Sequence, residues 1–486
     1  MSIHSDVPFH RDDRPSGRKK PGELREIRSE YQRDLDRVIY DYSFRRLAEI
    51  TQVSSGSGKI LRHNRMTHSL KVAQVGRRLV QYLLHEASNM PGIKQAGGLD
   101  ADVVDAAGLL HDIGHPPFGH VAEEELNAIA RRPPYHLDDG FEGNAQTLRI
   151  ILSLATHRKR DENFAAPGMD LTHAVTAACV KYPWMDSPGG PRRKWGVYLP
   201  EWNSFEQYVA PLLPAENTPT LEAEIMDWAD DITYAVHDLQ DFFVDGLIPL
   251  HQLKHSADNE DNTPNARYPT EMNDFWQYAT EKLRARDDHM PPSVEARNLF
   301  GKYARRFPDR PYGGSREEKA AIGSLASEII SAASMATSVK DTGRLYVEPE
   351  MKAVISALKE ITWFYVIDRP ALISVQVGQR KKVHDLFDRL IKWVEVAYEE
   401  TDTKAGGSTR GYVRDEKWIR QRRLPSELTQ FINALLSNNR NEGTYQCRQK
   451  DLVRGTLDYV ASMTEREFDD MYLRLTRGEM TSYPVV

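Results

Sequence analysis

Apolar residues recur at steps of three and four along most of the chain, which is the spacing of amphipathic helices. At 67–85, for example, this spacing places Leu70, Val72, Val75, Leu79 and Leu83 in one stripe. Sustained alternation of apolar and polar residues, typical of strands, is missing from the sequence, and so is any repeat of fixed period. We therefore predict an all-α protein, with helices within 23–53 and at 67–85, 101–110, 121–131, 141–157, 170–181, 221–244, 450–463 and 465–477.

Polar or Pro- and Gly-rich stretches separate these helices. The segment 182–220 is rich in Pro, Gly and Trp, and its length favours a functional loop over a core element. Shorter interruptions predict a loop at 54–60, a connection at 91–98 and a surface loop at 251–268. Residues 269–345 read as mixed helix and charged loop, and 402–423 as a charged interruption among the C-terminal helices.

The most chemically suggestive stretch is LLHDIGHPPFGHVAE at 109–123. His111 and Asp112 end an apolar helix, where an imidazole nitrogen and a carboxylate oxygen can bind one divalent metal. The Pro-Pro-Phe-Gly turn that follows His115 can then bring His115 and His120 back beside this metal.

The predicted helix at 221–244 has one apolar and one acidic face. The acidic face gathers Asp227, Asp230, Tyr234, Asp238 and Asp241. Aspartate is a poor helix former and like charges one turn apart repel, yet no Lys or Arg occurs between Trp195 and Leu253. A bound divalent cation would compensate this charge, and a simple solvated face is the alternative.

A third element is Arg65-Met66-Thr67-His68, at the start of the helix at 67–85. A single histidine in this position is more often a cap or surface residue. Beside the His-Asp pair and the acidic helix, however, His68 becomes a plausible fourth ligand. Mixed nitrogen and oxygen donors suit manganese, iron, cobalt, nickel or magnesium, and a metal with open positions can polarise a phosphoryl oxygen.

Composition narrows the class of protein. The chain has 486 residues, and this length suggests about three domains, although helical enzymes of this size are often one body. A net charge of −7 argues against a general nucleic-acid coat protein. Cys179 and Cys447 lie far apart and outside any metal-binding spacing, so we expect no disulfides and a reducing compartment. Without an 18-residue apolar run or an apolar signal core, we expect no membrane segment and a cytoplasmic location.

Taken in order, these motifs resemble the HD-domain superfamily of metal-dependent phosphohydrolases, and within it the deoxyguanosinetriphosphate triphosphohydrolase (dGTPase-like) family. The similarity is dense over 23–250, and one block carries it into the C-terminal part. The resembling pieces are DYSFRRLAEITQV (41–53), RMTHSLKV (65–72), HDIGHPPFGHVAE (111–123), FEGNAQTLRI (141–150), LTHAV with VKYPW (171–184), ADDITYAVHDLQD (229–241) and DYVASMTEREFDDMY (458–472).

The resemblance implies hydrolysis of a deoxynucleoside triphosphate (dNTP), such as dGTP, to deoxynucleoside and inorganic triphosphate. It places a divalent metal ion (Mn²⁺, Mg²⁺ or another transition metal) on His68, His111, Asp112 and Asp230. In the family's D-x3-Y-x3-D pattern, which Asp230 fits, the tyrosine matching Tyr234 packs against the sugar where a 2′-hydroxyl would lie. Gln52 and Asp238 resemble the groups that bind the 3′-hydroxyl, and burying such polar groups makes the loss of their partner costly.

The residue types fit this chemistry. Attack at the α-phosphorus must expel the sugar 5′-oxygen, a poor leaving group unless it is protonated. His120, one helical turn from Glu123, is the first candidate for proton transfer and His115 the second, with the choice of acid, base or nucleophile left open. Roughly four negative charges on the triphosphate require basic partners. The candidates are Arg65, Lys181, Tyr182 and Lys194, and the alternative for Lys194 is a surface loop charge.

The resemblance also suggests how the chain is divided. We expect a flexible arm at 1–22, an HD-type phosphohydrolase core at 23–250, a variable helical and loop insertion at 251–345, and a C-terminal helical region at 346–486 that completes the fold. The sequence departs from the family at Ile50, where a lysine is common, and 251–345 matches no family block. The family is usually homo-oligomeric, often hexameric, with nucleotide effectors in some members.

Two alternatives remain. One is a different HD-domain nucleotidase or phosphodiesterase. The other is a nucleotide-sensing or nucleic-acid-binding assembly with gated hydrolysis, because KWIRQRR at 417–423 interleaves a tryptophan with cations and could contact a nucleotide or single-stranded nucleic-acid effector. For that cluster, an exposed charged loop is the simpler interpretation.

Overall fold

The computed structural model describes residues 10–16, 27–52, 64–156, 168–187, 194–258, 271–285, 294–403, 424–438 and 445–478. Within these ranges the protein is built of helices, and the single sheet is a two-stranded antiparallel hairpin of β1 (Thr337–Val339) and β2 (Leu345–Val347). The all-α expectation is therefore confirmed. None of the helices in these ranges has both the length and the apolar composition needed to cross a membrane.

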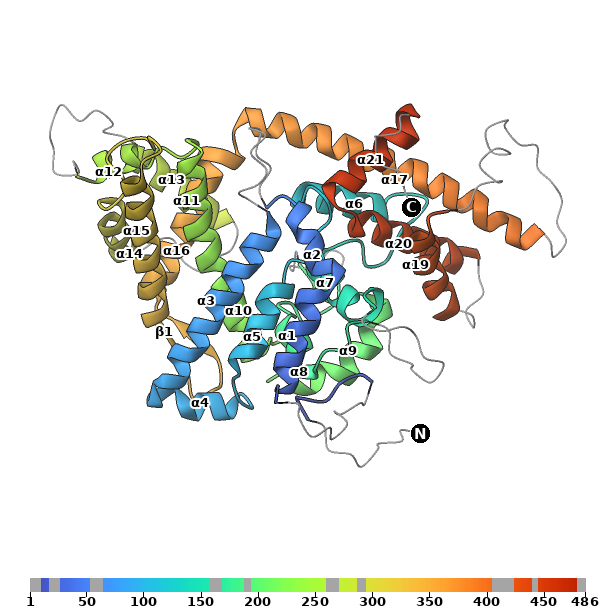
Figure 1. Ribbon diagram of the computed structural model, residues 1–486, viewed down its shortest axis with the longest axis horizontal. Helices are drawn as coiled ribbons and strands as arrows, with labels where there is room; N and C mark the ends of the chain where they lie inside the picture. Colours follow the sequence, from blue (N-terminus) through green and yellow to red (C-terminus); the bar gives the residue numbers. More distant parts are fainter. Residues whose placement is uncertain are drawn as a thin grey trace.

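Three helices form the centre of the molecule: α3 (Arg65–His85), α5 (Ala101–Leu110) and α10 (Leu221–Thr233) (Figure 1). α1 (Glu30–Tyr40) and α8 (His173–Ala178) pack against α5. Glycines let α3 and α5 approach closely, since a Cβ on Gly76 would lie 2.8 Å from a Val104 methyl carbon. Likewise, a Cβ on Gly108 would lie 2.7 Å from the Ala73 Cα. This contact fixes where each helix delivers its polar end.

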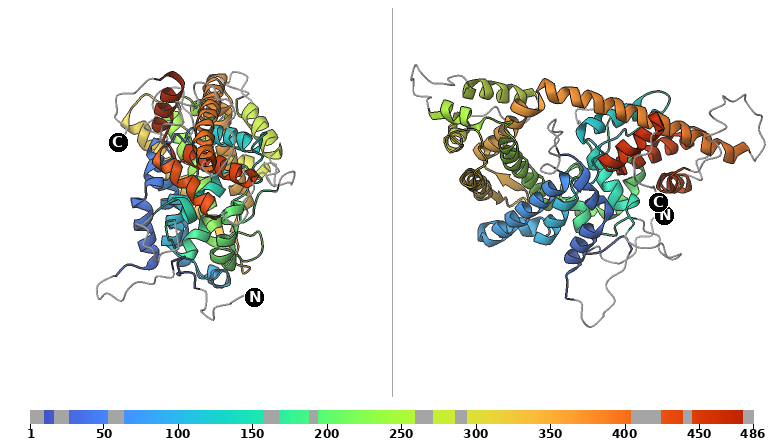
Figure 2. Two further views of the ribbon diagram at one scale, coloured as in Figure 1. Left: turned by 90° about the vertical axis from the view of Figure 1, so that its right-hand side faces the viewer. Right: turned by 45° about the horizontal axis from the view of Figure 1, so that its top comes forward.

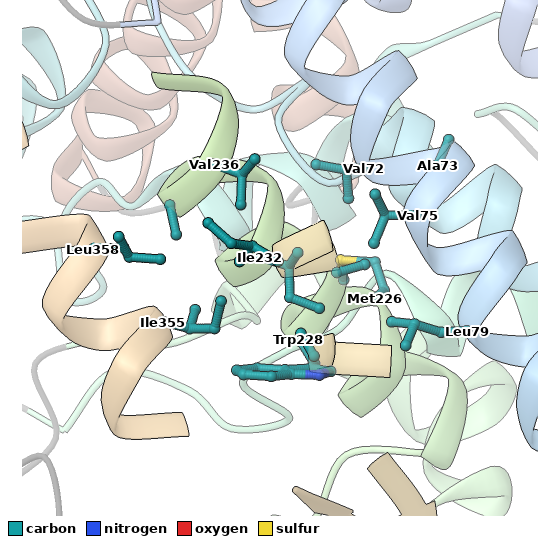
Figure 3. Packing of buried hydrophobic residues seen from close by; sticks show 14 of the residues in the cluster. Val72, Ala73, Val75, Leu79, Met226, Trp228, Ile232, Val236, Ile355 and Leu358 are labelled. Carbon is teal, nitrogen blue, oxygen red and sulfur yellow. The ribbon is translucent and has the colours of Figure 1, made fainter. Parts of the chain in front are cut away.

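The main apolar core lies between α3, α10 and α16 (Pro349–Thr362) (Figure 3). Each helix contributes side chains at helical spacing, all of them buried, so burial of one stripe per helix stabilises the arrangement. The labelled members are Val72, Ala73, Val75 and Leu79 of α3, Met226, Trp228 and Ile232 of α10, Val236 just after it, and Ile355 and Leu358 of α16.

A second core joins α6 (His120–Arg131) to the C-terminal helices α17 (Pro370–Thr403), α19 (Ser426–Asn438), α20 (Tyr445–Ser462) and α21 (Glu465–Arg477). Figures 1 and 2 show α17 running along one edge of the molecule, from the group of α12 to α16 at one end to α19, α20 and α21 at the other. The C-terminal helices therefore pack on a helix from the first third of the chain.

The remaining helices are shorter or peripheral. The described ranges also contain three π-helical turns, at Ile150–Leu154, Tyr234–Asp238 and Trp363–Ile367. The second of these joins α10 to α11. The other helices are α2 (Tyr42–Arg46), α4 (Met90–Gln95), α7 (Gly143–Arg149), α9 (Trp202–Tyr208), α11 (Leu239–Val244), α12 (Leu250–Asp258), α13 (Glu271–Ala285), α14 (Val294–Ala304) and α15 (Arg316–Met335).

Some sequence-based boundaries were wrong. The expected connection at 91–98 contains α4, where a proline in the first turn is compatible with a helix. The expected surface loop at 251–268 begins inside α12, because Leu250, Leu253 and Ala257 form a short buried stripe among polar residues. Its remainder, 259–268, lies outside the described residues, as do the loop at 54–60 and the basic cluster at 417–423.

Part of the expected N-terminal arm packs on the core. Within 10–16, the buried Arg14 pairs with Asp34 and donates to the Asp170 carbonyl at 2.7 Å. Residues 1–9 and 17–22 lie outside the described part of the chain. The division of the chain into four regions stays a prediction.

Candidate metal centre and active-site cavity

A cavity of about 620 Å³ opens where α3, α5 and α10 meet the start of α6, the end of α16 and the start of α17. This volume lies within the range of about 300–1,000 Å³ that is usual for small-molecule sites. Most of the residues singled out from the sequence line it together, although they come from distant parts of the chain. They are Gln52, Arg65, His111, Asp112, His115, His120, Lys181, Tyr182, Lys194, Asp230 and Tyr234.

Three of the four predicted metal ligands converge at the base of the cavity. One donor atom each of His68, His111 and Asp230 lies within 4.8 Å of the others. The Oδ1 atom of Asp230 is 2.9 Å from Nε2 of His68 and 3.5 Å from Nε2 of His111. The other ring nitrogen of His111, Nδ1, lies 2.8 Å from the Gly108 carbonyl. A proton on Nδ1 leaves the lone pair of Nε2 directed toward His68 and Asp230, where it can bind a metal, as in metal-binding histidines generally.

The residues present fit a divalent cation. Nε2 of His111 is buried and makes no hydrogen bond within the described part of the chain. Buried polar atoms usually have a partner, so this nitrogen is available as a metal ligand. Burial lowers the pKa of His68, and Lys181 and the two histidines outweigh burial to hold the pKa of Asp230 well below its usual value. At His111 the carboxylates of Asp112 and Asp230 outweigh burial and raise the pKa, so the cluster attracts positive charge.

Asp112, the fourth predicted ligand, lies beside this group. Its Oδ1 atom is 3.6 Å from Nε2 of His111 and 3.1 Å from Nδ1 of His115. Its Oδ2 atom accepts a hydrogen bond from Arg65 at 2.7 Å. Against the effect of burial, Arg65 and the histidines keep the pKa of Asp112 well below its usual value. Asp112 is thus an ionised carboxylate at the edge of the cluster.

His115, His120 and Glu123 form a second group at the α6 side of the cavity, which meets the first group where His115 contacts Asp112. Nδ1 of His120 lies 2.7 Å from a Glu123 oxygen, and the other Glu123 oxygen accepts from the Gly143 amide at 2.9 Å. The His120 side chain is 61% exposed, whereas His115 is buried and packs edge-on against it at 5.0 Å between ring centres. Burial and the charge of Arg65 lower the pKa of His115 to about 4, so His115 is neutral at physiological pH.

Lysines around the cavity compensate part of the negative charge on the acidic face of the helix predicted at 221–244. Lys181 lies 2.7 Å from Asp230 and 3.1 Å from Asp227, Lys71 lies 3.7 Å from Asp241, and Lys359 pairs with Asp231. These lysines come from other elements, which an inspection of sequence neighbours could not find. The acidic face is therefore partly neutralised by the protein itself.

Sequence reasoning missed several residues of the cavity wall. Lys359 of α16 is one, and its Nζ atom lies 5.7 Å from the centre of the Tyr234 ring. Others are Asn144 and Asp231 and, from α17, Gln376 and Arg380. Asn144 and Asp231 stand within the resembling blocks FEGNAQTLRI and ADDITYAVHDLQD, so a signal was present for them. Nothing local distinguishes Lys359 from other lysines on a helix.

The two predicted sugar contacts are placed differently. Gln52 lines the cavity, and its Oε1 atom is buried with no hydrogen bond among the described residues. Asp238 is buried in the π turn behind the lining residues, and one of its oxygens is likewise unbonded there. Burial and the neighbouring Asp241 raise the pKa of Asp238 to about 8.

Comparisons with known proteins agree with this site. The HD domain family matches residues 65–235, which include His68, His111, Asp112 and Asp230. The chain is 33% identical to a protein of Corynebacterium glutamicum strain R, over 80% of this chain and 87% of that protein. It is 31% identical to a protein of Corynebacterium efficiens (75% and 80%) and 32% identical to one of Streptomyces coelicolor (77% and 83%). All three are named deoxyguanosinetriphosphate triphosphohydrolase-like proteins.

Proposed function

Because this chain belongs to the deoxyguanosinetriphosphate triphosphohydrolase-like family of HD-domain phosphohydrolases, we propose that it is a metal-dependent dNTP triphosphohydrolase. The proposed reaction converts a dNTP such as dGTP to deoxynucleoside and inorganic triphosphate. The observation that carries the proposal is that one cavity combines the His68, His111 and Asp230 cluster, several lysines and the His120–Glu123 pair. A divalent ion held by the cluster and Asp112 would polarise a phosphoryl oxygen and make water more acidic.

The chain's own cations would bind the triphosphate. Arg65, Lys181, Lys194 and Lys359 all line the cavity, and Tyr182 adds a hydroxyl. Roughly four negative charges require several such partners, because an unpaired charge in a partly desolvated site is costly. Lys194 is exposed and faces the cavity, which supports a role in substrate binding over that of a remote loop charge.

The sugar would lie against Tyr234. That ring forms part of the cavity wall, where it would leave little room for a 2′-hydroxyl. Gln52 carries a buried oxygen at the cavity surface that has no hydrogen-bond partner among the described residues, and a 3′-hydroxyl could donate to it. Asp238 would support this contact from behind the wall.

His120 would carry the proton that the reaction requires. Hydrolysis joins a water oxygen to the α-phosphorus and breaks the bond from that phosphorus to the 5′-oxygen, which must gain a proton. His120 is accessible from the cavity, and Glu123 orients its ring through Nδ1, which leaves Nε2 for the exchange. The buried, neutral His115 packs against this ring and would restrict its rotation.

Product identity tests the proposal. Purified protein is incubated with each dNTP and Mn²⁺, with an EDTA-treated sample as the control, and the products are separated by ion-exchange chromatography. We expect deoxynucleoside and inorganic triphosphate, formed only with metal. Nucleoside monophosphate with pyrophosphate would overturn the proposal in favour of another HD-domain phosphohydrolase. Sedimentation of the same sample tests the homo-oligomer that we also propose.

A further inference from the structure

Glu465, the first residue of α21, binds two segments that lead into the active-site cavity. One of its carboxylate oxygens accepts hydrogen bonds from the backbone N–H of Thr51 at 2.8 Å and of Phe118 at 3.2 Å. The other accepts from the Thr51 hydroxyl at 2.9 Å. A single carboxylate therefore joins two segments that are far apart in the sequence.

Both segments lead directly into the cavity. Thr51 precedes Gln52, whose buried oxygen faces the proposed sugar site. Phe118 lines the cavity and stands two residues before His120. Displacement of Thr51 would therefore move the sugar contact, and displacement of Phe118 would move the proposed proton-transfer group.

The turn at Phe118 needs external support. Phe118 has a φ of 67°, a left-handed conformation that is costly for a bulky residue, and Gly119 follows with a φ of 59°. Such a conformation persists only when surrounding contacts fix it. The bond from the Phe118 N–H to Glu465 is one such contact.

Arg46 connects Met463, two residues before Glu465, to the segment that precedes this turn. The buried Arg46 donates to the carbonyl of Met463 at 2.9 Å, and to those of Ile113 and His115 at 2.7 and 2.9 Å. Residues 463–465 thus contact the HDIGHPPFGH stretch directly at Phe118, and Arg46 links them indirectly to its backbone at Ile113 and His115. Residues 463–465 lie outside the matched HD domain, which ends at residue 235.

We propose that Glu465 is a positioning residue of the active site: its carboxylate sets the distance between the Gln52 segment and the Phe118–His120 turn. It thereby couples 3′-hydroxyl recognition to proton transfer. This inference rests on the proposed function. Glu465 acts through Thr51 and Phe118 and touches no reacting atom.

Glu467 provides a matched control on the same helix. It too is an acid in the first turn of α21, so both residues interact similarly with the helix dipole. Glu467 accepts from the Thr464 N–H at 2.8 Å and from the Tyr42 hydroxyl at 3.1 Å. These contacts stabilise the helix but do not involve residue 51 or 118.

The experiment compares Glu465→Ala, Glu465→Gln and Glu467→Ala in the full chain. Steady-state kinetics are measured with the preferred dNTP and with its 2′,3′-dideoxy analogue. We expect Glu465→Ala to lower kcat/KM for the dNTP by about 100-fold, since small misplacements of reacting groups have effects of this size. The analogue lacks the 3′-hydroxyl, so its kcat/KM should fall about tenfold less than that of the dNTP. The ratio of the two kcat/KM values, which measures discrimination, should therefore narrow by about tenfold.

Glu465→Gln should restore most of the activity. Its amide oxygen can accept both backbone N–H groups, and its NH₂ group can donate to the Thr51 hydroxyl, which also accepts. Thr51→Val removes only the hydroxyl contact and should show a smaller loss. Glu467→Ala should lower Tm without changing discrimination.

Hydrogen exchange gives a readout that does not depend on turnover. The amides of Thr51 and Phe118 should exchange faster in Glu465→Ala than in Glu467→Ala. Unchanged discrimination and unchanged exchange in Glu465→Ala would overturn the inference, and so would equal effects of Glu467→Ala at an equal loss of Tm. If Glu465→Ala does not fold, Thr51→Val decides instead: a smaller loss of discrimination with faster exchange of the Thr51 amide would support the inference, and no change in either would overturn it. Wild-type protein that forms no triphosphate would defeat the proposed function instead.

Discussion

The two sides of the cavity are built differently. His68, His111 and Asp230 come from α3, α5 and α10, which pack on one another through the main core, and both histidines are almost completely buried. His120 stands at the exposed start of α6, whose other face belongs to the second core with the C-terminal helices. One side offers fixed, desolvated donor atoms, and the other offers an imidazole that solvent can reach.

This difference implies that metal binding and proton transfer are separable. A ligand set gains from burial because dehydrated donors in fixed positions bind a cation without rearrangement. A proton-transfer group gains from exposure because it must regain or lose its proton after each turnover. Variants on one side should therefore change metal affinity, and variants on the other should change only the rate.

The largest effect is expected for Asp230→Ala. It removes the carboxylate that both histidines face, so the protein should lose bound Mn²⁺ in calorimetric titration. Several kcal/mol of electrostatic stabilisation correspond to a drop in kcat of about 10³-fold or more. Asp227→Asn, one turn away and also in contact with Lys181, is the control and should keep the metal. Full turnover by Asp230→Ala would contradict the metal assignment.

His120→Ala tests the exposed side. General acid or base catalysis contributes about 10² to 10⁴-fold, and kcat should fall by this factor while Mn²⁺ affinity stays unchanged. His85→Ala serves as the control, because that histidine is 86% exposed and lies at the end of α3 away from the cavity. Loss of metal binding in His120→Ala would show that the two sides are not separable.

Lys194→Ala should have an intermediate effect on substrate binding. A charged hydrogen bond to phosphate is worth about 1.5–3 kcal/mol, which predicts a rise in KM of about 10- to 150-fold with a smaller change in kcat. Steady-state kinetics at constant ionic strength measure both. Lys94→Ala, on the exposed side of α4, is the matched control. An unchanged KM would return Lys194 to the interpretation as a surface loop charge.

The smallest effect concerns stability. Burial and the charge of Glu123 raise the pKa of Glu142 to about 7 in the folded protein, against about 4.3 in an unfolded chain. The folded state therefore favours the neutral carboxyl, and its contribution to stability is present below pH 4 and is lost as pH rises to 7. Glu142→Gln should flatten this dependence.

Urea unfolding at pH 5 and pH 8 measures the effect. Between pH 5 and pH 8, we expect the free energy of unfolding of the wild type to fall by on the order of 1–3 kcal/mol more than that of Glu142→Gln. Glu350→Gln, at the exposed start of α16, is the control and should follow the wild type. Parallel losses in all three proteins would show that Glu142 does not titrate in this window.

Much of the site could be predicted because its residues stand at the ends of strongly patterned helices. The predicted helices at 101–110 and 465–477 match α5 and α21 at both ends. Asp100 and Thr464 cap the N-termini of these two helices. Lys359 could not be predicted, since only tertiary packing carries α16 to the acidic face of α10. α12 was missed because its short apolar stripe lies among polar residues. The roles of the individual site residues stay predictions.

The π turn at Tyr234–Asp238 also limits how this sequence can change in length. At about 100° per residue, an uninterrupted α-helix would direct Asp230 and Asp238 about 80° apart, and the wider π turn reduces that angle. Deleting one residue here would restore an ordinary helix, and because the π turn accommodates about one extra residue, the buried Leu239 and Phe242 beyond it would keep nearly their present orientation. A one-residue deletion elsewhere in α10 or α11 would instead rotate every residue beyond it by about 100°, so a change of length is compatible with the packing only within these five residues.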